Sequence, residues 1–317
     1  MSRSNHVERL AVVQVASVQK TAGPPWLIEG LWAEEGVGIV GGAPKSLKTW
    51  LALEMALSVA SGKSALDTYP VPRAGPVLVF AAEDAPEMIR SRLEGLAIRS
   101  GVNLARVPLH LILASRLRLD TDVDQARLRD AVAHYQPRLL VLDPFVRVHT
   151  IDENSAMEVS RILAYLRTLQ REHHVAVVVV HHARKAGAGM SQAGLSLRGS
   201  GDFYAWGDST LVLRRNKDRL LMIIEHRSAA PPDPVELLLR TENGGLPYLE
   251  VTSQQKTNDL STLKERVLAS LNNTKKPMTQ ESLRSELKVR MQNLVCALRE
   301  MEADHTLSRT PAGWTVS

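Results

Sequence analysis

The sequence predicts an α/β protein with a mostly parallel sheet covered by helices on both faces, followed by a small helical domain. Two observations predict the sheet: short apolar runs alternate with helical patterns along the chain, and these runs contain few polar residues. Residues 175–180 read VAVVVV, which is typical of a strand buried on both faces. A third observation predicts the small domain, because the hydrophobic spacing after residue 260 fits three short helices.

The individual elements follow from this pattern. Strands are predicted at residues 36–40, 76–81, 107–113, 138–142 and 175–180, and helices at residues 50–60, 86–100 and 154–172. The last helix is indicated by five apolar residues that share one face: Val159, Ile162, Leu163, Leu166 and Leu169. Residues 209–213, 219–224, 235–239 and 248–251 follow with short turns and without helices, so we expect antiparallel meander strands at one edge of the sheet.

The composition changes divide the chain into four expected segments. Residues 1–25 form an N-terminal arm that ends in two prolines, and residues 26–252 form the α/β domain. Residues 253–259 are polar and helix-poor, which indicates a linker. Residues 260–317 combine three helices with a terminal hairpin around Pro311, Ala312 and Gly313, and this order predicts a winged helix-turn-helix domain.

The bulk composition excludes several classes of protein. The 317 residues are 44% hydrophobic and 23% charged, which is globular composition. No apolar run approaches the roughly 20 residues of a membrane span, and the N-terminus lacks a signal segment, so we expect a cytoplasmic protein without a membrane segment. The single cysteine, Cys296, excludes a disulfide framework and a cysteine-based zinc site. The net charge of +5 is compatible with nucleic-acid binding but does not prove it.

One loop carries the strongest functional signal. It lies between a predicted strand and a predicted helix and consists of Gly42, Ala43, Pro44, Lys45, Ser46, Leu47, Lys48 and Thr49. A strand, a tight loop, Lys-Thr and a helix form the context of a phosphate-binding loop, in which backbone N–H groups and the helix N-terminus attract phosphate. Lys48 is expected to reach the β- and γ-phosphates of ATP, and Thr49 to ligate Mg²⁺.

The loop departs from the usual pattern GxxxxGK[ST] at one position. Leu47 stands where the pattern has glycine, whose missing Cβ lets the backbone come close to phosphate. Either the leucine raises the cost of closing the loop, or the loop tolerates it. The plain alternative is an ordinary strand-to-helix turn that holds two lysines.

Acidic residues follow two of the predicted strands. Asp143 ends the strand 138–142 and has the position of the aspartate that completes the Mg²⁺ shell. Glu83 follows the strand 76–81 at its carboxyl end, where ligands bind in open α/β sheets, and is the candidate catalytic base. Asp84 is expected to cap the helix that begins near Pro86. The alternative is that these acids are only turn and cap residues.

Histidines and a glycine-rich loop follow the strand 175–180. His181 and His182 end this strand, and a polar group there could sense the γ-phosphate; adjacent strand residues face opposite ways, which disfavours a metal site. The loop 183–197 contains several glycines between basic residues and could follow the backbone of single-stranded DNA. A structural histidine and a plain surface loop are the alternatives.

Five segments in this order resemble a known family: GAPKSLKT, AAEDAP, LLVLDPF, VVVHHARK and LRGSG. They resemble the RecA-like ATPases of the plasmid replicative helicase type, the RepA-like hexameric helicases, over roughly residues 24–250. The resemblance implies that Lys48 and Thr49 bind phosphate and Mg²⁺, that Glu83 is the catalytic glutamate and that Asp143 is linked to Mg²⁺. It also implies that His182 senses the γ-phosphate and that the loop 183–197 contacts DNA.

The resemblance leaves the arginine finger open. Such an arginine, supplied by a neighbouring subunit, is worth about 10³ or more in rate. Arg198, which opens the RGS-type segment of this family, is one candidate, and Arg214 and Arg215 are the others. The spacing fixes none of them.

The C-terminal segment has a small excess of basic over acidic residues. The residue types that suit base edges and phosphates lie at or near its second and third helices: Lys275, Lys276, Arg290, Gln292, Asn293 and Arg299. These residues favour contact with duplex DNA through residues 260–317. Winged helices also serve as protein–protein modules, so the fold alone does not decide the partner.

Together these features predict a Mg²⁺-dependent ATPase acting on DNA, a hexameric helicase-like motor for replication of a plasmid or other mobile element. The alternative is a nucleotide-gated DNA-binding protein with weak hydrolysis. The third reading is a scaffold whose phosphate-binding loop has decayed. Leu47 favours the second and third readings, and the set of Glu83, Asp143 and His182 favours the first.

Overall fold

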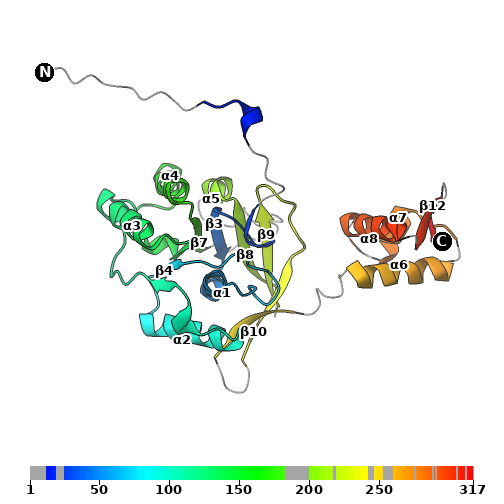
Figure 1. Ribbon diagram of the computed structural model, residues 1–317, viewed down its shortest axis with the longest axis horizontal. Coiled ribbons are helices and arrows are strands. Elements are labelled where there is room, and N and C mark those ends of the chain that lie inside the picture. Colours follow the sequence, from blue (N-terminus) through cyan, green and yellow to red (C-terminus); the bar gives the residue numbers. More distant parts are fainter. Residues whose placement is uncertain are drawn as a thin grey trace. The chain divides into compact units, whose positions relative to one another are not determined.

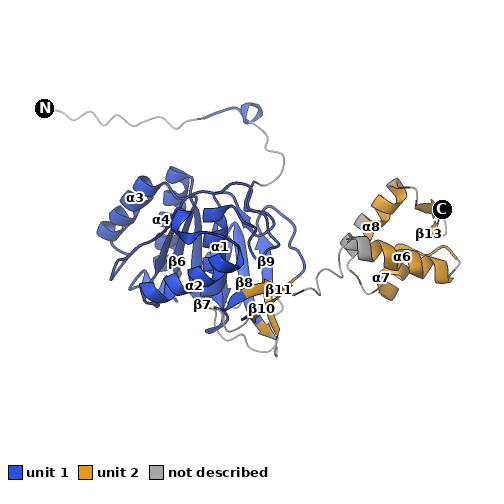
Figure 2. Cartoon of the chain, turned by 60° about the horizontal axis from the view of Figure 1, so that its bottom comes forward, with its two compact units in different colours: residues 1–214, 223–233, 241–248 blue, residues 215–222, 234–240, 249–317 orange. Residues whose placement is uncertain are grey.

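The computed structural model describes residues 12–18, 25–182, 200–216, 219–241, 246–252, 260–274, 276–287, 289, 291–304, 306–310 and 313–316. The chain divides into two compact units, shown in different colours in Figure 2. The first unit comprises residues 1–214, 223–233 and 241–248, and the second comprises residues 215–222, 234–240 and 249–317.

A nine-stranded sheet organises the α/β part of the chain. Its order is β11-β10-β9-β8-β3-β7-β6-β4-β5. The strands are β3 (Val37–Gly42), β4 (Val77–Ala81), β5 (Leu109–Leu111), β6 (Leu139–Asp143), β7 (Ala176–His182), β8 (Ser209–Asn216), β9 (Arg219–His226), β10 (Val235–Arg240) and β11 (Tyr248–Val251). All pairings from β8 to β5 are parallel, whereas β9 and β10 pair antiparallel. The predicted mostly parallel sheet is therefore confirmed.

Helices cover both faces of this sheet (Figure 1). They are α1 (Lys48–Ser61), α2 (Pro86–Arg99), α3 (Asp122–Tyr135), α4 (Ala156–His173) and the short α5 (Ser200–Trp206). In Figure 1, α1 and α2 lie on one side of the strands, and α3, α4 and α5 lie on the other. The strands are apolar because both of their faces are covered: all six residues from Ala176 to His181 in β7 are buried.

Smaller elements complete this part of the chain. They are the hairpin of β1 (Trp26–Ile28) and β2 (Trp32–Ala33) and the 3-10 helices η1 (Val15–Ser17), η2 (Leu104–Arg106) and η3 (Phe145–Arg147). Among the described residues, no helix is both long and apolar enough to cross a bilayer.

Two elements differ from the sequence-based expectations. We expected residues 209–213 to be an antiparallel edge strand, but β8 pairs in parallel with β3 and extends the parallel sheet. The helix α3 was not predicted, because only Leu128 and Val132 give it a buried apolar face. Its N-cap is Thr121, whose hydroxyl accepts a hydrogen bond from the backbone N–H of Asp124.

The C-terminal residues form three helices and a hairpin with a core of their own. The elements are α6 (Leu260–Thr274), α7 (Gln280–Leu287), α8 (Met291–Ala303), β12 (Leu307–Thr310) and β13 (Gly313–Val316). Apolar side chains from every element, including Leu263, Leu283, Leu298 and Trp314, pack in one cluster. Thr279 caps the start of α7, because its hydroxyl accepts a hydrogen bond from the backbone N–H of Ser282. The expected linker, residues 253–259, lies outside the described residues.

Candidate active site

The candidate site lies at the carboxyl ends of four neighbouring parallel strands. The strand order β3-β7-β6-β4 places the phosphate-binding loop, His182, Asp143 and Glu83 in one row. Gly42 pairs with His182 across β3 and β7, and Ala81 pairs with Asp143 across β4 and β6. Residues that are far apart in the sequence therefore meet at one edge of the sheet, which is where ligands bind in open α/β folds.

Gly42 is the glycine that the loop requires. Its φ is +153°, and a Cβ at this position would lie 2.6 Å from the backbone oxygen of Leu213 and 2.6 Å from Oγ of Ser46. No other residue fits without moving the neighbouring strand. The hydroxyl of Ser46 is buried and has no hydrogen-bond partner among the described residues, so it is a donor and acceptor left over inside the loop.

Leu47 closes the loop in the left-handed conformation that glycine would adopt easily. Its φ is +67° and its ψ is +23°, and the helix α1 begins at the next residue. A side chain in this conformation costs about 1–2 kcal/mol, because the Cβ crowds the following backbone oxygen. The loop therefore has the shape of a phosphate-binding loop, at an energetic cost that glycine at this position would remove.

Lys48 is buried beneath the loop, with only 5% of its surface exposed. Its Nζ donates a hydrogen bond of 2.9 Å to the backbone oxygen of Ala43, so the side chain folds back toward the start of the loop. Burial lowers the pKa of Lys48, and the negative charges of Asp143 and Glu83 oppose this shift. The ammonium group therefore contacts the loop and is stabilised in its charged form by both candidate acids.

Asp143 ends β6 beside the first turn of α1. Burial raises the pKa of Asp143 to about 6; the hydroxyl of Thr49 and the charge of Lys48 hold it lower, while Glu83 pushes it higher. A hydroxyl and a carboxylate are the hard oxygen ligands that Mg²⁺ takes in nucleotide sites. Thr49 and Asp143 therefore fit a Mg²⁺ ion chemically.

The two acids after β4 have different partners. The carboxylate of Glu83 lies 3.2 Å from Nε of Arg147, and both side chains are about half exposed. Asp84 does not cap α2: the N-cap position is Ala85, and Asp84 forms an ion pair with Arg92 at 2.6 Å instead. A cap was expected because Pro86 follows, but Arg92 reaches back two turns and takes the carboxylate.

His182 ends β7 on the same side as Lys48. Burial lowers the pKa of His182; the positive charge of Lys48 lowers it further, and Glu83 opposes the shift. The imidazole is therefore neutral at neutral pH, with one N–H to donate and one lone pair to accept.

The remaining candidates do not join this row in the described part of the chain. Arg198 and the loop 183–197 lie outside the described residues. Arg214 and Arg215 are exposed residues of β8. The sequence reasoning missed Arg147, which pairs with Glu83, and it missed Glu153, which contacts both His149 and His181. The only signal for Arg147 was its place four residues after Asp143.

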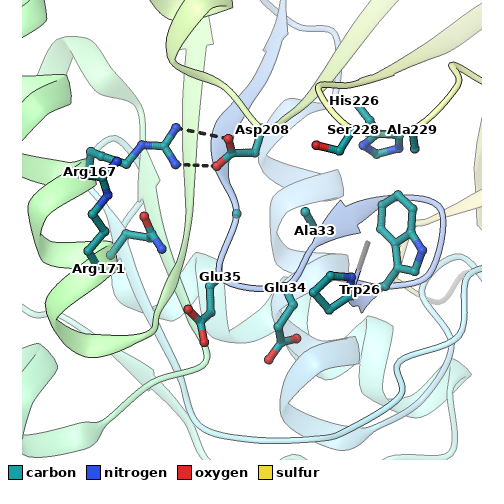
Figure 3. A pocket seen from close by; sticks show the side chains of 13 residues that line it. Trp26, Ala33, Glu34, Glu35, Arg167, Arg171, Asp208, His226, Ser228 and Ala229 are labelled. Carbon is teal, nitrogen blue, oxygen red and sulfur yellow. Dashed lines mark hydrogen bonds and ion pairs between the residues drawn. The ribbon is translucent and has the colours of Figure 1, made fainter. Parts of the chain in front are cut away.

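A separate cavity of about 730 Å³ lies at the opposite end of β3, near its first residues. Figure 3 shows Arg167 from α4 facing Asp208, with two contacts between the guanidinium and the carboxylate. Asp208 also accepts a hydrogen bond from the backbone N–H of Val37. This pair joins α4 to the start of β3 and β8, so it stabilises the amino edge of the sheet.

Comparison with known proteins decides the family. The model of the family described as AAA domain matches residues 3–188, which is more than half of the chain. The chain belongs to the AAA domain family. The phosphate-binding loop, Glu83, Asp143 and His182 all lie within the matched residues, so this AAA domain is a P-loop NTPase domain.

Solved structures agree on the fold of this AAA domain. One, described as an ATPase domain, superposes with a TM-score of 0.52 at 16% identity, over 68% of this chain and 86% of that chain. Another, described as a DnaB-like replicative helicase and its interactions with primase, has a TM-score of 0.50 at 14% identity, over 68% of this chain and 57% of that chain. The expected RecA-like ATPase fold is therefore present.

Proposed function

We propose that this AAA domain protein is a Mg²⁺-dependent ATPase that acts on DNA as a helicase-like motor. One observation carries the proposal: the strand order brings the loop of Lys48 and Thr49 to the same edge of the sheet as Asp143 and Glu83, where Thr49 and Lys48 both hold the pKa of the Asp143 carboxyl lower. An acid, a hydroxyl and a lysine at the mouth of such a loop are the parts that bind a nucleoside triphosphate with its metal.

Each residue of the row has a distinct role in this proposal. Lys48 neutralises the β- and γ-phosphates, and the loop N–H groups from Gly42 to Leu47 hold them. Thr49 and Asp143 would hold Mg²⁺, which supplies positive charge against the phosphates. Glu83, freed from Arg147, orients and deprotonates the attacking water, and neutral His182 donates a hydrogen bond to the γ-phosphate.

The DNA-related part of the proposal rests on the sequence and on the kind of protein that shares the fold. The order of the five motifs resembles that of RepA-like hexameric helicases. One solved structure with a similar fold is described as a DnaB-like replicative helicase. We therefore propose that the loop 183–197 binds single-stranded DNA and that the protein assembles as a hexamer. We also propose that it serves a plasmid or other mobile element and acts in the cytoplasm. An arginine of a neighbouring subunit, with Arg198 first among the candidates, completes the site.

The C-terminal module is proposed to be a winged helix that contacts duplex DNA. Three helices followed by an antiparallel hairpin support this, with α8 as the recognition helix. Lys276 is exposed between α6 and α7 and can reach the DNA backbone. Removing residues 259–317 should weaken duplex binding and leave ATP hydrolysis intact, and unchanged duplex affinity would indicate a protein-docking module instead.

The deciding experiment is steady-state ATP hydrolysis by the full chain, with and without single-stranded DNA, beside Lys48→Ala. Turnover that rises with DNA and is lost in the variant supports the motor. Turnover that is the same with and without DNA would support the ATPase activity and contradict the DNA-coupled motor.

A second candidate function is a nucleotide-gated DNA-binding protein with weak hydrolysis. It is favoured by the left-handed Leu47 and by the ion pair that holds Glu83 on Arg147. Nucleotide binding without turnover in the parent protein would select this second function.

A further inference from the structure

A buried cluster of charged and aromatic side chains lies behind the candidate site. Glu153 contacts two imidazoles: its carboxylate lies 3.5 Å from Nε2 of His149 and 3.6 Å from Nε2 of His181. The two histidine side chains are 2% and 1% exposed, and the glutamate side chain is 12% exposed. None of these residues belongs to the row of nucleotide-binding side chains.

The cluster is enclosed by aromatic rings. Phe145 packs on His149 with ring centroids 4.4 Å apart, and Phe203 packs on His181 at the same 4.4 Å. The two phenylalanines also meet edge to face. The rings shield the two imidazoles from water, the Glu153 side chain is 12% exposed, and the two imidazoles hold the pKa of its carboxyl well below the usual range.

Burying such a cluster costs free energy of folding, so its presence calls for a functional reason. Both ring nitrogens of His149 and of His181 are buried and have no hydrogen-bond partner among the described residues, since the Glu153 carboxylate lies only at ion-pair distance from Nε2 of each, and each such atom costs about 1–3 kcal/mol. A metal ion does not account for it, because no group of three ligand side chains within the described ranges has the geometry to hold one. An apolar replacement would pack here at lower cost.

The position of the cluster suggests that reason. β7 is paired with β3 up to His182, but its pairing with β6 runs only from Ala176 to Val179. The last residues of β7 therefore lack strand support on the β6 side. In this part of β7 the carboxylate of Glu153 contacts the side chain of His181, and His182 follows directly with its side chain on the opposite face.

We propose that Glu153 is a positioning residue: through His181 it fixes the end of β7, and so aims His182 at the γ-phosphate. This inference rests on the proposed role of His182 as the γ-phosphate sensor. Glu153 itself touches no nucleotide, so its loss changes how His182 meets the third phosphate and leaves the phosphate-binding loop unchanged.

The test compares two nucleotides and requires no catalysis. Dissociation constants for ADP and for the non-hydrolysable ATP analogue AMP-PNP are measured with Mg²⁺ on the full chain. In Glu153→Gln the ADP affinity stays within about twofold of the parent, while affinity for AMP-PNP falls by about twofold to tenfold, the range for one hydrogen bond. Glu158→Gln is the matched control, because that carboxylate accepts from the backbone N–H of Asp152 in the same segment and touches neither histidine.

A double variant shows whether the effect passes through His182. His182→Ala loses the same preference for AMP-PNP, and adding Glu153→Gln to it causes no further loss. An additive loss overturns the inference, as does a parent-like preference in Glu153→Gln alone. Equal losses of ADP and AMP-PNP affinity also overturn it, because they indicate a purely structural role.

Two further outcomes are separable. If Glu153→Gln does not fold, Glu153→Asp takes its place: the charge stays with the imidazoles but retracts by one methylene, and the same results decide. If the parent binds neither nucleotide, the proposed function fails and this inference fails with it. Binding by the parent together with an unchanged preference in the variant overturns this inference alone.

Discussion

The carboxylate of Glu54, on α1, accepts a hydrogen bond of 2.9 Å from the backbone N–H of Leu66. This bond ties the helix that follows the phosphate-binding loop to the turn at residues 65–69. Glu54 is only 2% exposed, and its second carboxylate oxygen has no hydrogen-bond partner among the described residues. Burial raises the pKa of Glu54, and the hydrogen bond from Leu66 and the charge of Arg99 only partly oppose this shift.

Glu54 should therefore make the protein less stable as pH rises. Below the unfolded-state pKa of 4.5 the carboxyl is protonated in both the folded and the unfolded state, so its ionisation does not affect stability. Above it, the unfolded chain loses its proton first, so stability falls until the pH passes the raised folded-state pKa. In Glu54→Gln this dependence is absent. The free energy of unfolding, measured from pH 5 to pH 8, should fall with pH in the parent relative to the variant; parallel curves would contradict this.

The left-handed backbone of Leu47 gives a second prediction. Leu47→Gly removes the crowding of the Cβ but gives the unfolded chain more freedom, so the free energy of unfolding should rise by no more than about 1 kcal/mol. Leu47→Val should lower it by about 1–2 kcal/mol, because a β-branched side chain tolerates positive φ least. Urea unfolding of the three proteins measures the order. A less stable glycine variant would show that the leucine side chain contributes more than the strain removes.

The row of site residues was predictable because it depends on the order of elements and not on details of packing. An apolar strand followed by a polar residue places that residue at the carboxyl edge, and parallel strands share that edge. This logic found Lys48, Thr49, Glu83, Asp143 and His182, and the strand register brings their elements together. Their roles in catalysis stay predictions.

The residues around this row were not predictable in the same way. Arg147 reaches Glu83, and Arg92 reaches Asp84, through side-chain conformations that no periodicity encodes. Glu153 meets His181 only because the segment after η3 folds over the end of β7, which joins residues far apart in the sequence. Spacing rules describe neighbours along a helix or strand, and they carry no information about such loop contacts.

Glu83 and Arg147 lead to a prediction about catalysis. Glu83→Gln should bind ATP as the parent does and lower kcat by about 10²–10⁴, because a general base contributes that much. Arg147→Ala removes only an exposed ion pair, which is worth about 0.2–1 kcal/mol, so kcat should change by less than about fivefold. Turnover of Glu83→Gln at the parental rate would show that another group is the base. A large loss in Arg147→Ala would show that this arginine contacts the phosphates.

Gly313 gives a prediction about the C-terminal module. The backbones of Met278 and Trp314 exchange two hydrogen bonds, of 2.9 and 2.8 Å, which fasten the hairpin to the start of α7. Gly313 precedes this contact with φ of +134°, and a Cβ on it would lie 2.4 Å from the backbone oxygen of Met278. Gly313→Ala should therefore break the contact and lower the stability of the module by about 1–3 kcal/mol. Amide hydrogen exchange in α6–α8 measures this loss.

Gly101→Ala separates the clash from the backbone strain. Gly101 also has a positive φ, +64°, at the end of α2, but a Cβ there would have no heavy atom within 4 Å. This control carries only the left-handed strain of about 1 kcal/mol, and only in the AAA domain. Hydrogen exchange in α6–α8 should stay parental in Gly101→Ala and rise in Gly313→Ala, while ATP turnover persists in both. Parental exchange in Gly313→Ala would mean that the hairpin can shift to admit a methyl group, and that its contact with Met278 does not hold the module together.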